Sequence, residues 1–166
     1  MADQKLLQAL TDAIRAEVEG HSFYLMAAQT TADKQGQEVF ERLAQEELKH
    51  AAFLRSQYDS LLSSGKVSEA KLGVPDFPAG SMIFSPELRS RVKEANFEVT
   101  ALSIGAQLEQ SAMVFYADQA AAAEDPAVAS FFTDLSEWER EHYRLLTGQL
   151  AELQHDFWGA NRFSPF

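Results

Sequence analysis

The sequence predicts an all-α protein: an antiparallel four-helix bundle made of two similar helical hairpins joined by one long crossover. Apolar residues recur every three or four positions through most of the 166 residues, and no segment shows sustained strand alternation. The five prolines cluster, which leaves three long stretches without proline. The chain also repeats itself at a spacing of 92 residues, as described below.

The first stretch holds two predicted helices. One apolar stripe runs from Leu7 to Ala28 and the next from Phe40 to Leu61. Between them, TTADKQG (residues 30–36) is a short polar turn, so we expect the two helices to be antiparallel neighbours.

The other two helices begin at recognisable signals. Ser85 precedes Pro86 as a predicted cap of the third helix, whose stripe runs from Leu88 to Ala120. Asp125 precedes Pro126 in the same way at the fourth helix. Residues 64–85 are too long for a tight turn and rich in Gly and Pro, so they suit a crossover along the outside of the bundle. We therefore expect a bundle over residues 1–156 and an aromatic C-terminal tail over 157–166.

An internal repeat relates the two hairpins. Residues 17–54, shifted by 92 positions, align without a gap on residues 109–146 and match at ten positions. Four of the matches are aromatic or small and three are polar residues on apolar stripes: Glu17/Glu109, Glu47/Glu139 and His50/His142. Two hairpins related by a pseudo-twofold axis follow from this pattern.

These six polar residues form the candidate metal site. Residues three apart share a helix face, so Glu47 and His50 can reach one point, and so can Glu139 and His142. Four buried carboxylates would repel one another strongly, and two divalent cations would balance their charge. Oxygen ligands with one imidazole per metal, and no thiolate, favour iron or manganese over structural zinc. The pattern matches the known arrangement of di-iron and di-manganese bundles.

Other residues near this site leave alternatives open. Tyr24 and Tyr116 follow their glutamates by two turns and either orient the ligands by hydrogen bonds or are plain core aromatics. His21 is expected to be a partly buried histidine with a local partner. Glu46 should point sideways, away from the site, and Trp138, its counterpart in the repeat, should face a neighbouring helix or subunit.

Composition excludes several functions. The chain contains no cysteine, so it has no disulfide and no cysteine nucleophile. A net charge of −11 disfavours nucleic acid as a partner and attracts cations. No apolar stretch is long enough for a membrane span, and the N-terminus lacks the pattern of a secretory signal. We therefore expect a cytoplasmic protein.

The motifs EVEGHSFY, EELKH, EQSAMVFY and EREH resemble those of the ferritin-like superfamily, and most closely its rubrerythrin branch. The resemblance covers about residues 5–155. It implies two non-haem iron ions, replaceable by manganese or zinc, with Glu17 and Glu109 each binding one ion and Glu47 and Glu139 bridging them. His50 and His142 would each bind one ion, and the four glutamates would form the catalytic centre.

The resemblance also implies an activity. Family members reduce hydrogen peroxide, or oxidise ferrous iron with oxygen or peroxide. Two departures bear on this chain: Ala112 stands where typical rubrerythrins carry a further glutamate, and the chain's 166 residues contain no cysteine, so we expect no cysteine-rich rubredoxin domain among them. Electrons would then come from an external donor, either a rubredoxin-like protein or a reductase.

Three functions remain open from the sequence. The first is a di-iron oxidoreductase that reduces peroxide or O2, expected to be a homodimer. The second is a ferroxidase or iron-handling protein of ferritin type. The third is a bundle without enzymatic activity whose centre holds zinc or nothing and whose tail binds a partner.

Overall fold

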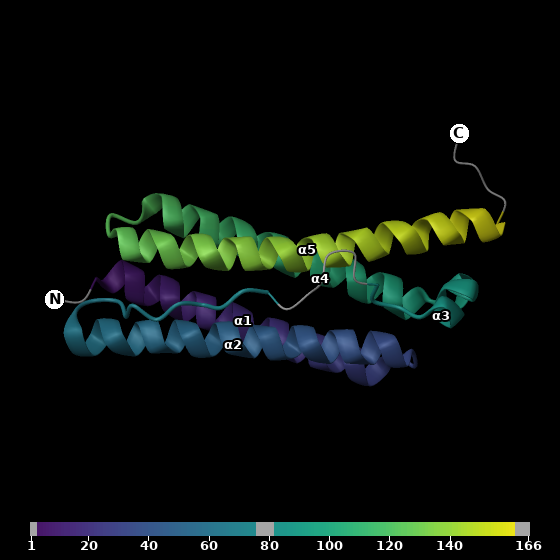
Figure 1. The fold of residues 1–166 in the computed structure, drawn as a ribbon, viewed down its shortest axis with the longest axis horizontal. Coiled ribbons are helices and arrows are strands. Elements are labelled where there is room, and N and C mark those ends of the chain that lie inside the picture. The colour runs from purple at the N-terminus through teal and green to yellow at the C-terminus, as the bar shows by residue number, and fades with distance from the viewer. Residues whose placement is uncertain (1–2, 76–81, 162–166) are drawn as a thin grey trace.

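The computed structural model describes residues 3–75 and 82–161. In these residues the regular structure is helical, and its elements in chain order are α1 (Gln4–Thr30), α2 (Lys34–Ser64), α3 (Pro86–Ser90), the 3-10 turn η1 (Val92–Glu94), α4 (Asn96–Ala122) and α5 (Pro126–Asn161). α1 packs along α2 and α4 along α5, and the two hairpins lie side by side (Figure 1). The predicted antiparallel four-helix bundle is confirmed.

Aspartate side chains cap the starts of α2 and α5. The cap at Asp125 is predicted by the sequence, and the cap at Asp33 lies within the predicted turn over residues 30–36. The side chain of Asp33 accepts a hydrogen bond from the Gly36 backbone N–H at 2.9 Å at the start of α2. At its counterpart, Asp125, the side chain accepts from the Ala127 N–H at 2.8 Å, and α5 begins at Pro126. A carboxylate at this position satisfies a backbone donor that the helix itself leaves unpaired.

The third predicted helix is interrupted, which corrects the sequence analysis. Ser85 caps a helix as predicted, but this helix, α3, ends after five residues, and α4 begins only at Asn96. No Gly or Pro lies between residues 91 and 95. The interruption instead accompanies burial of Val92 and Ala95, which are 5% and 0% exposed, where η1 packs against α5. Tertiary packing overrides the helical pattern at this point.

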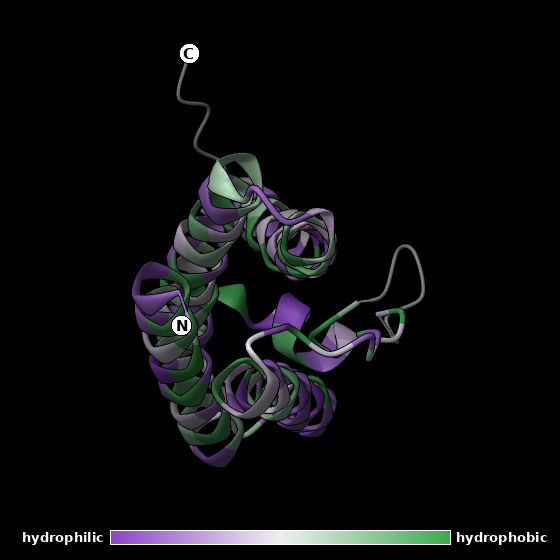
Figure 2. Cartoon of the chain, turned by 90° about the vertical axis from the view of Figure 1, so that its left-hand side faces the viewer, coloured by the Kyte–Doolittle hydropathy of each residue, from purple (hydrophilic) through white to green (hydrophobic). Residues whose placement is uncertain are grey.

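The described parts of the crossover lie along one side of the bundle (Figures 1 and 2). It begins at Gly65, whose φ of 72° closes α2 in the left-handed conformation that glycine adopts readily. Its far end is anchored, because the backbone N–H groups of Ile83 and Phe84 donate to Gln149 Oε1 at 2.7 and 3.3 Å. Residues 76–81 of the predicted crossover lie outside the described residues.

The C-terminal helix passes the predicted boundary at residue 156. α5 continues to Asn161, and Phe157 and Trp158, which belong to the expected tail, are helical and 40% and 42% exposed. Residues 162–166 of that tail lie outside the described residues. None of the helices in the described part of the chain is long and apolar enough to cross a membrane.

The apolar core is divided into two clusters with polar residues between them. Along α1, Leu10 belongs to one cluster and Tyr24 to the other, and Glu17 lies between them. In each of the other three long helices, the glutamate likewise lies between residues of one cluster and residues of the other. The bundle therefore encloses a polar layer at mid-length with apolar packing on both sides.

Candidate metal centre

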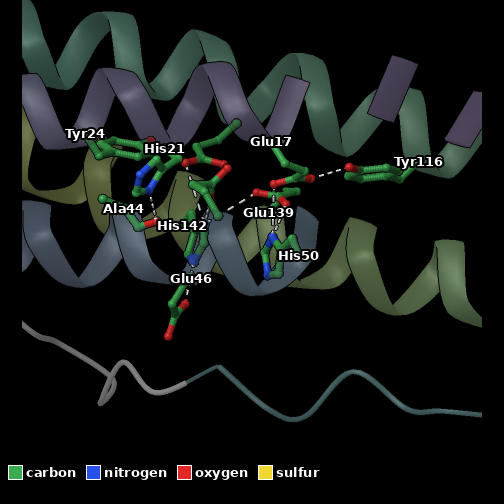
Figure 3. Close-up of polar contacts among 11 residues, drawn as sticks. Glu17, His21, Tyr24, Ala44, Glu46, His50, Tyr116, Glu139 and His142 are labelled. Carbon is green, nitrogen blue, oxygen red and sulfur yellow. Dashed lines mark hydrogen bonds and ion pairs between the residues drawn. The ribbon is translucent and has the colours of Figure 1, made fainter. Parts of the chain in front are cut away.

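All six predicted side chains meet in the polar layer. α1 and α4 contribute one glutamate each, and α2 and α5 contribute a glutamate and a histidine each (Figure 3). All are at most 5% exposed: Glu17, Glu47, His50, Glu109, Glu139 and His142. Residues from both hairpins thus form one buried cluster.

The cluster consists of two overlapping groups. Glu17, Glu47, His50 and Glu139 form one group, and Glu47, Glu109, Glu139 and His142 form the other. In each group the candidate ligand atoms lie within 4.8 Å of one another. Glu47 and Glu139 belong to both groups, and this is the placement that bridging ligands between two ions require.

The histidines face these carboxylates through their Nδ1 atoms. His50 Nδ1 lies 2.9 Å from Glu139 Oε1 and 3.3 Å from Glu17 Oε2. On the other side, His142 Nδ1 lies 3.2 Å from Glu47 Oε1 and 3.4 Å from Glu139 Oε2. The two rings are nearly parallel, with an interplanar angle of 16° and centroids 5.8 Å apart.

Hydrogen bonding in the cluster is incomplete, which fits a site for cations. Among the described residues, Glu47 Oε1 and both carboxylate oxygens of Glu139 are buried with a histidine Nδ1 at ion-pair distance but without a well-directed hydrogen bond. A buried carboxylate in this condition is costly unless a cation or a proton compensates it. These three oxygens belong to the two shared glutamates, so ions bound in the two groups would supply the ligand contacts that the hydrogen bonds do not.

Protons compensate part of the carboxylate charge when no metal is bound. Burial and the neighbouring charge of Glu139 raise the pKa of Glu109 to about 8. Burial and the same neighbour raise the pKa of Glu47 well above its usual range. Burial also opposes ionisation of Glu139, but the positive charge of His50 and hydrogen bonds from Glu109, His142 and His50 together outweigh it and lower the pKa of Glu139. Glu139 is thus kept charged while Glu47 and Glu109 favour the protonated form.

The histidines carry the matching positive charge. Burial alone would lower the pKa of His50, but the attraction of Glu139 and Glu17 raises it to about 10. Burial likewise opposes protonation of His142, and Glu109 and Glu139 more than offset it, so the pKa of His142 is raised well above its usual range. Metal binding requires neutral imidazole and ionised carboxylate, so it must displace these protons.

The two tyrosines hydrogen-bond to ligand candidates, but each does so across the bundle. The Tyr24 hydroxyl donates to Glu109 Oε1. The Tyr116 hydroxyl donates to Glu17 Oε1 (Figure 3). The sequence had associated each tyrosine with the glutamate of its own helix. Both rings also pack in the core, Tyr24 on Phe40 and Tyr116 on Phe132, so the two roles that the sequence left open are combined.

Glu46 was placed wrongly by the sequence analysis. Its side chain is 1% exposed rather than directed away from the site, and its Oε2 lies 2.7 Å from His142 Nε2 (Figure 3). The partner lies in the other hairpin, so spacing within one helix could not reveal it. His21 is partly buried as predicted, but its partner is not local: its Nδ1 lies 2.7 Å from the backbone oxygen of Ala44 in α2.

A cavity of about 320 Å³ leads to the cluster between α1 and α4. Glu17, Glu47 and Glu109 line its inner part. Gly20 and Ala112, which are counterparts in the repeat, also line it, and a Cβ atom added at Gly20 would lie 2.7 Å from Glu47 Oε2. Small residues at these two positions therefore leave room for a small molecule beside the cluster.

Comparison with known proteins identifies a family. The family model described as Rubrerythrin matches residues 8–150, which include every residue of the cluster. No match was found to the curated proteins or to the solved structures.

Proposed function

We infer that this chain, which belongs to the rubrerythrin family of ferritin-like helical bundles, is a non-haem di-iron oxidoreductase that reduces hydrogen peroxide or O2. The observation that carries the proposal is the pair of buried groups that share Glu47 and Glu139. Glu17 and His50 would complete one iron site, and Glu109 and His142 the other. The four glutamates would form the catalytic centre.

The protein's own contribution follows from the geometry. Bound iron would supply the electrons for the reduction, and the side chains would fix the centre and control access to it. The hydroxyl groups of Tyr24 and Tyr116 hold Glu109 and Glu17 in place. The two apolar clusters exclude water from both sides, so the reactants enter through the cavity between α1 and α4.

Several features of the setting belong to the same proposal. An external electron donor, rubredoxin-like or a reductase, would return electrons to the centre between turnovers. The protein would work in the cytoplasm as a homodimer, without nucleic acid or membrane as a partner. The acidic surface, with a net charge of −11, supports the exclusion of nucleic acid.

Stopped-flow oxidation of the diferrous protein tests the reaction class. The protein is loaded anaerobically with ferrous iron and mixed with O2 or with H2O2, and oxidation is followed by absorbance. We expect rapid oxidation by at least one of the two, and the faster reaction identifies the oxidant. Oxidation no faster than that of ferrous iron in buffer, with both oxidants, would overturn the proposal.

Ferroxidation coupled to iron handling is the second candidate. Asp12 and Glu19 line the same cavity, so carboxylates at its wall would draw ferrous iron toward the cluster. Assembly state separates the two functions. A hollow many-subunit shell with a mineral core would indicate iron storage, whereas a dimer that retains only its di-iron centre would indicate reduction of peroxide or O2.

A further inference from the structure

The two halves of the cluster differ at one pair of equivalent positions. The residue directly before each shared glutamate is Glu46 in the first hairpin and Trp138 in the second, and the repeat aligns these two. Both side chains are buried, at 1% and 6% exposure, and each contacts a histidine of the opposite hairpin. The cluster is therefore symmetric in its six candidate ligands but not in the residues behind the histidines.

Glu46 supports His142. Its Oε2 lies 2.7 Å from His142 Nε2, and a carboxylate can only accept a hydrogen bond. An N–H on Nε2 places the ring's lone pair on Nδ1, the atom that faces Glu47 and Glu139. A carboxylate behind a histidine orients the ring, makes it a stronger metal ligand and brings a further negative charge close to the ion.

Trp138 cannot do this for His50. The two rings are perpendicular, with centroids 4.8 Å apart, and the indole N–H donates to the Gly73 backbone oxygen at 3.0 Å. Indole offers no acceptor, and His50 Nε2 is buried with no hydrogen-bond partner among the described residues. Within the described part of the chain, the His50 ring is held on this side by packing against Trp138 and receives no added charge.

We propose that the centre binds its two metal ions in a fixed order, first in the group around His142 and then, more weakly, in the group around His50. The proposal rests on the proposed function, since it requires that both groups bind a metal ion. Loss of a carboxylate partner behind a metal-bound histidine typically lowers affinity about 10- to 100-fold, so we expect a difference of that size. At one equivalent of metal, the protein then holds a single ion beside His142, and the His50 position is the exchangeable one.

Zinc titration of the metal-free protein, followed by NMR of the histidine ring nitrogens, tests the order directly. We expect the His142 nitrogens to shift during the first equivalent and the His50 nitrogens during the second. Calorimetry of the same titration should resolve two binding constants. Parallel shifts of both rings, or His50 responding first, would overturn the inference.

A variant of nearly the same shape tests the effect of the Glu46 carboxylate on the metal-binding constants. Glu46→Gln should lower the first binding constant about 10- to 100-fold and bring the two constants together, while far-UV circular dichroism stays unchanged. Glu41→Gln removes a negative charge from the exposed side of the same helix and should leave both constants unchanged. Equal small effects of the two variants would overturn the role of Glu46. If wild-type protein binds no zinc, cobalt or iron at all, the proposed function itself fails, and this result is distinct from binding two ions equally.

Discussion

Two phenol hydroxyl groups connect the hairpins at the candidate centre. Tyr24 donates to Glu109 and Tyr116 to Glu17. Each hairpin therefore holds the glutamate of the other hairpin that belongs to only one of the two groups. Burial, followed by the nearby carboxylate charges, raises the pKa of both tyrosines well above the usual range, so both remain donors. The glutamates therefore keep one orientation before metal binds.

Removing either hydroxyl should weaken metal binding. Tyr24→Phe or Tyr116→Phe leaves a buried carboxylate oxygen without its donor, and we expect affinity to fall about 10- to 100-fold for the group that contains that glutamate. Competition with a chelating dye measures the change. Tyr58→Phe is the matched control: Tyr58 lies in α2 and packs against an apolar cluster, so loss of its hydroxyl should have no effect on metal affinity. Unchanged affinity in both site variants would show that the tyrosines serve packing alone.

The size of the side chain at residue 20 should also affect the metal affinity of the site. Gly20→Ala places a Cβ 2.7 Å from Glu47 Oε2, so Glu47 must move and metal affinity should fall. Gly148→Ala, in α5, meets nothing within 4 Å and should instead stabilise the protein by about 0.4–1 kcal/mol. Metal binding and thermal unfolding of both variants separate these effects. Full affinity in Gly20→Ala would show that Glu47 has room to shift without consequence.

Among the individual residues, the six candidate ligands could be predicted because the repeat places the same residue types at the same spacing on apolar stripes. Glu46 and the tyrosine pairings could not, because each contact joins residues in different hairpins. Periodicity within a helix shows which face is buried but not which side chain lies opposite it. Glu46 also differs in type from its counterpart Trp138, so the repeat itself gave no signal.

The packing of the bundle depends on the crossover as well as on the long helices. Phe84 is fully buried, and the centroid of its ring lies 5.9 Å from that of Phe40. Beside it, the backbone N–H of Ile83 donates a hydrogen bond to Gln149 Oε1. Helix starts at Ser85 and Asp125 could be predicted because capping is a local effect. The interruption before Asn96 could not, because it accompanies packing of Val92 against α5.

Truncating Phe84 should therefore destabilise the whole bundle. Phe84→Ala should lower the free energy of unfolding by about 3–5 kcal/mol, the usual cost of emptying a buried aromatic site. Val74→Ala, in the same crossover but 85% exposed, should change it by less than about 0.5 kcal/mol. Urea unfolding gives both values. Similar small changes in the two variants would mean that the crossover contributes little to the stability of the bundle.

Across the whole molecule, the metal-free protein balances four buried carboxylates with protons. The pKa of His50 is raised to about 10 and that of Glu109 to about 8, so the folded protein binds these protons more tightly than the unfolded chain does. A proton held more tightly in the folded state stabilises it at low pH, and the stabilisation is lost as pH rises through the folded pKa.

The stability of the metal-free protein should consequently fall as pH rises. The contribution of Glu109 declines between about 4.5 and about 8, and that of His50 between about 6.5 and about 10. Thermal unfolding in the presence of a chelator, at pH values across these windows, measures the trend. The metal-loaded protein should lose less stability over the same range, because metal ions replace the protons. Rising stability of the metal-free protein between pH 7 and pH 9 would contradict the charge balance.

The central claim is that the polar layer of this bundle holds two metal ions. Equilibrium dialysis of the metal-free protein against ferrous iron, without oxygen, followed by metal analysis, tests it most directly. We predict about two iron ions per chain for the wild type, as a six-ligand di-iron bundle requires, and substantial loss in Glu47→Gln and Glu139→Gln. Fewer than about one ion per chain in the wild type, or full loading in both variants, would contradict the account.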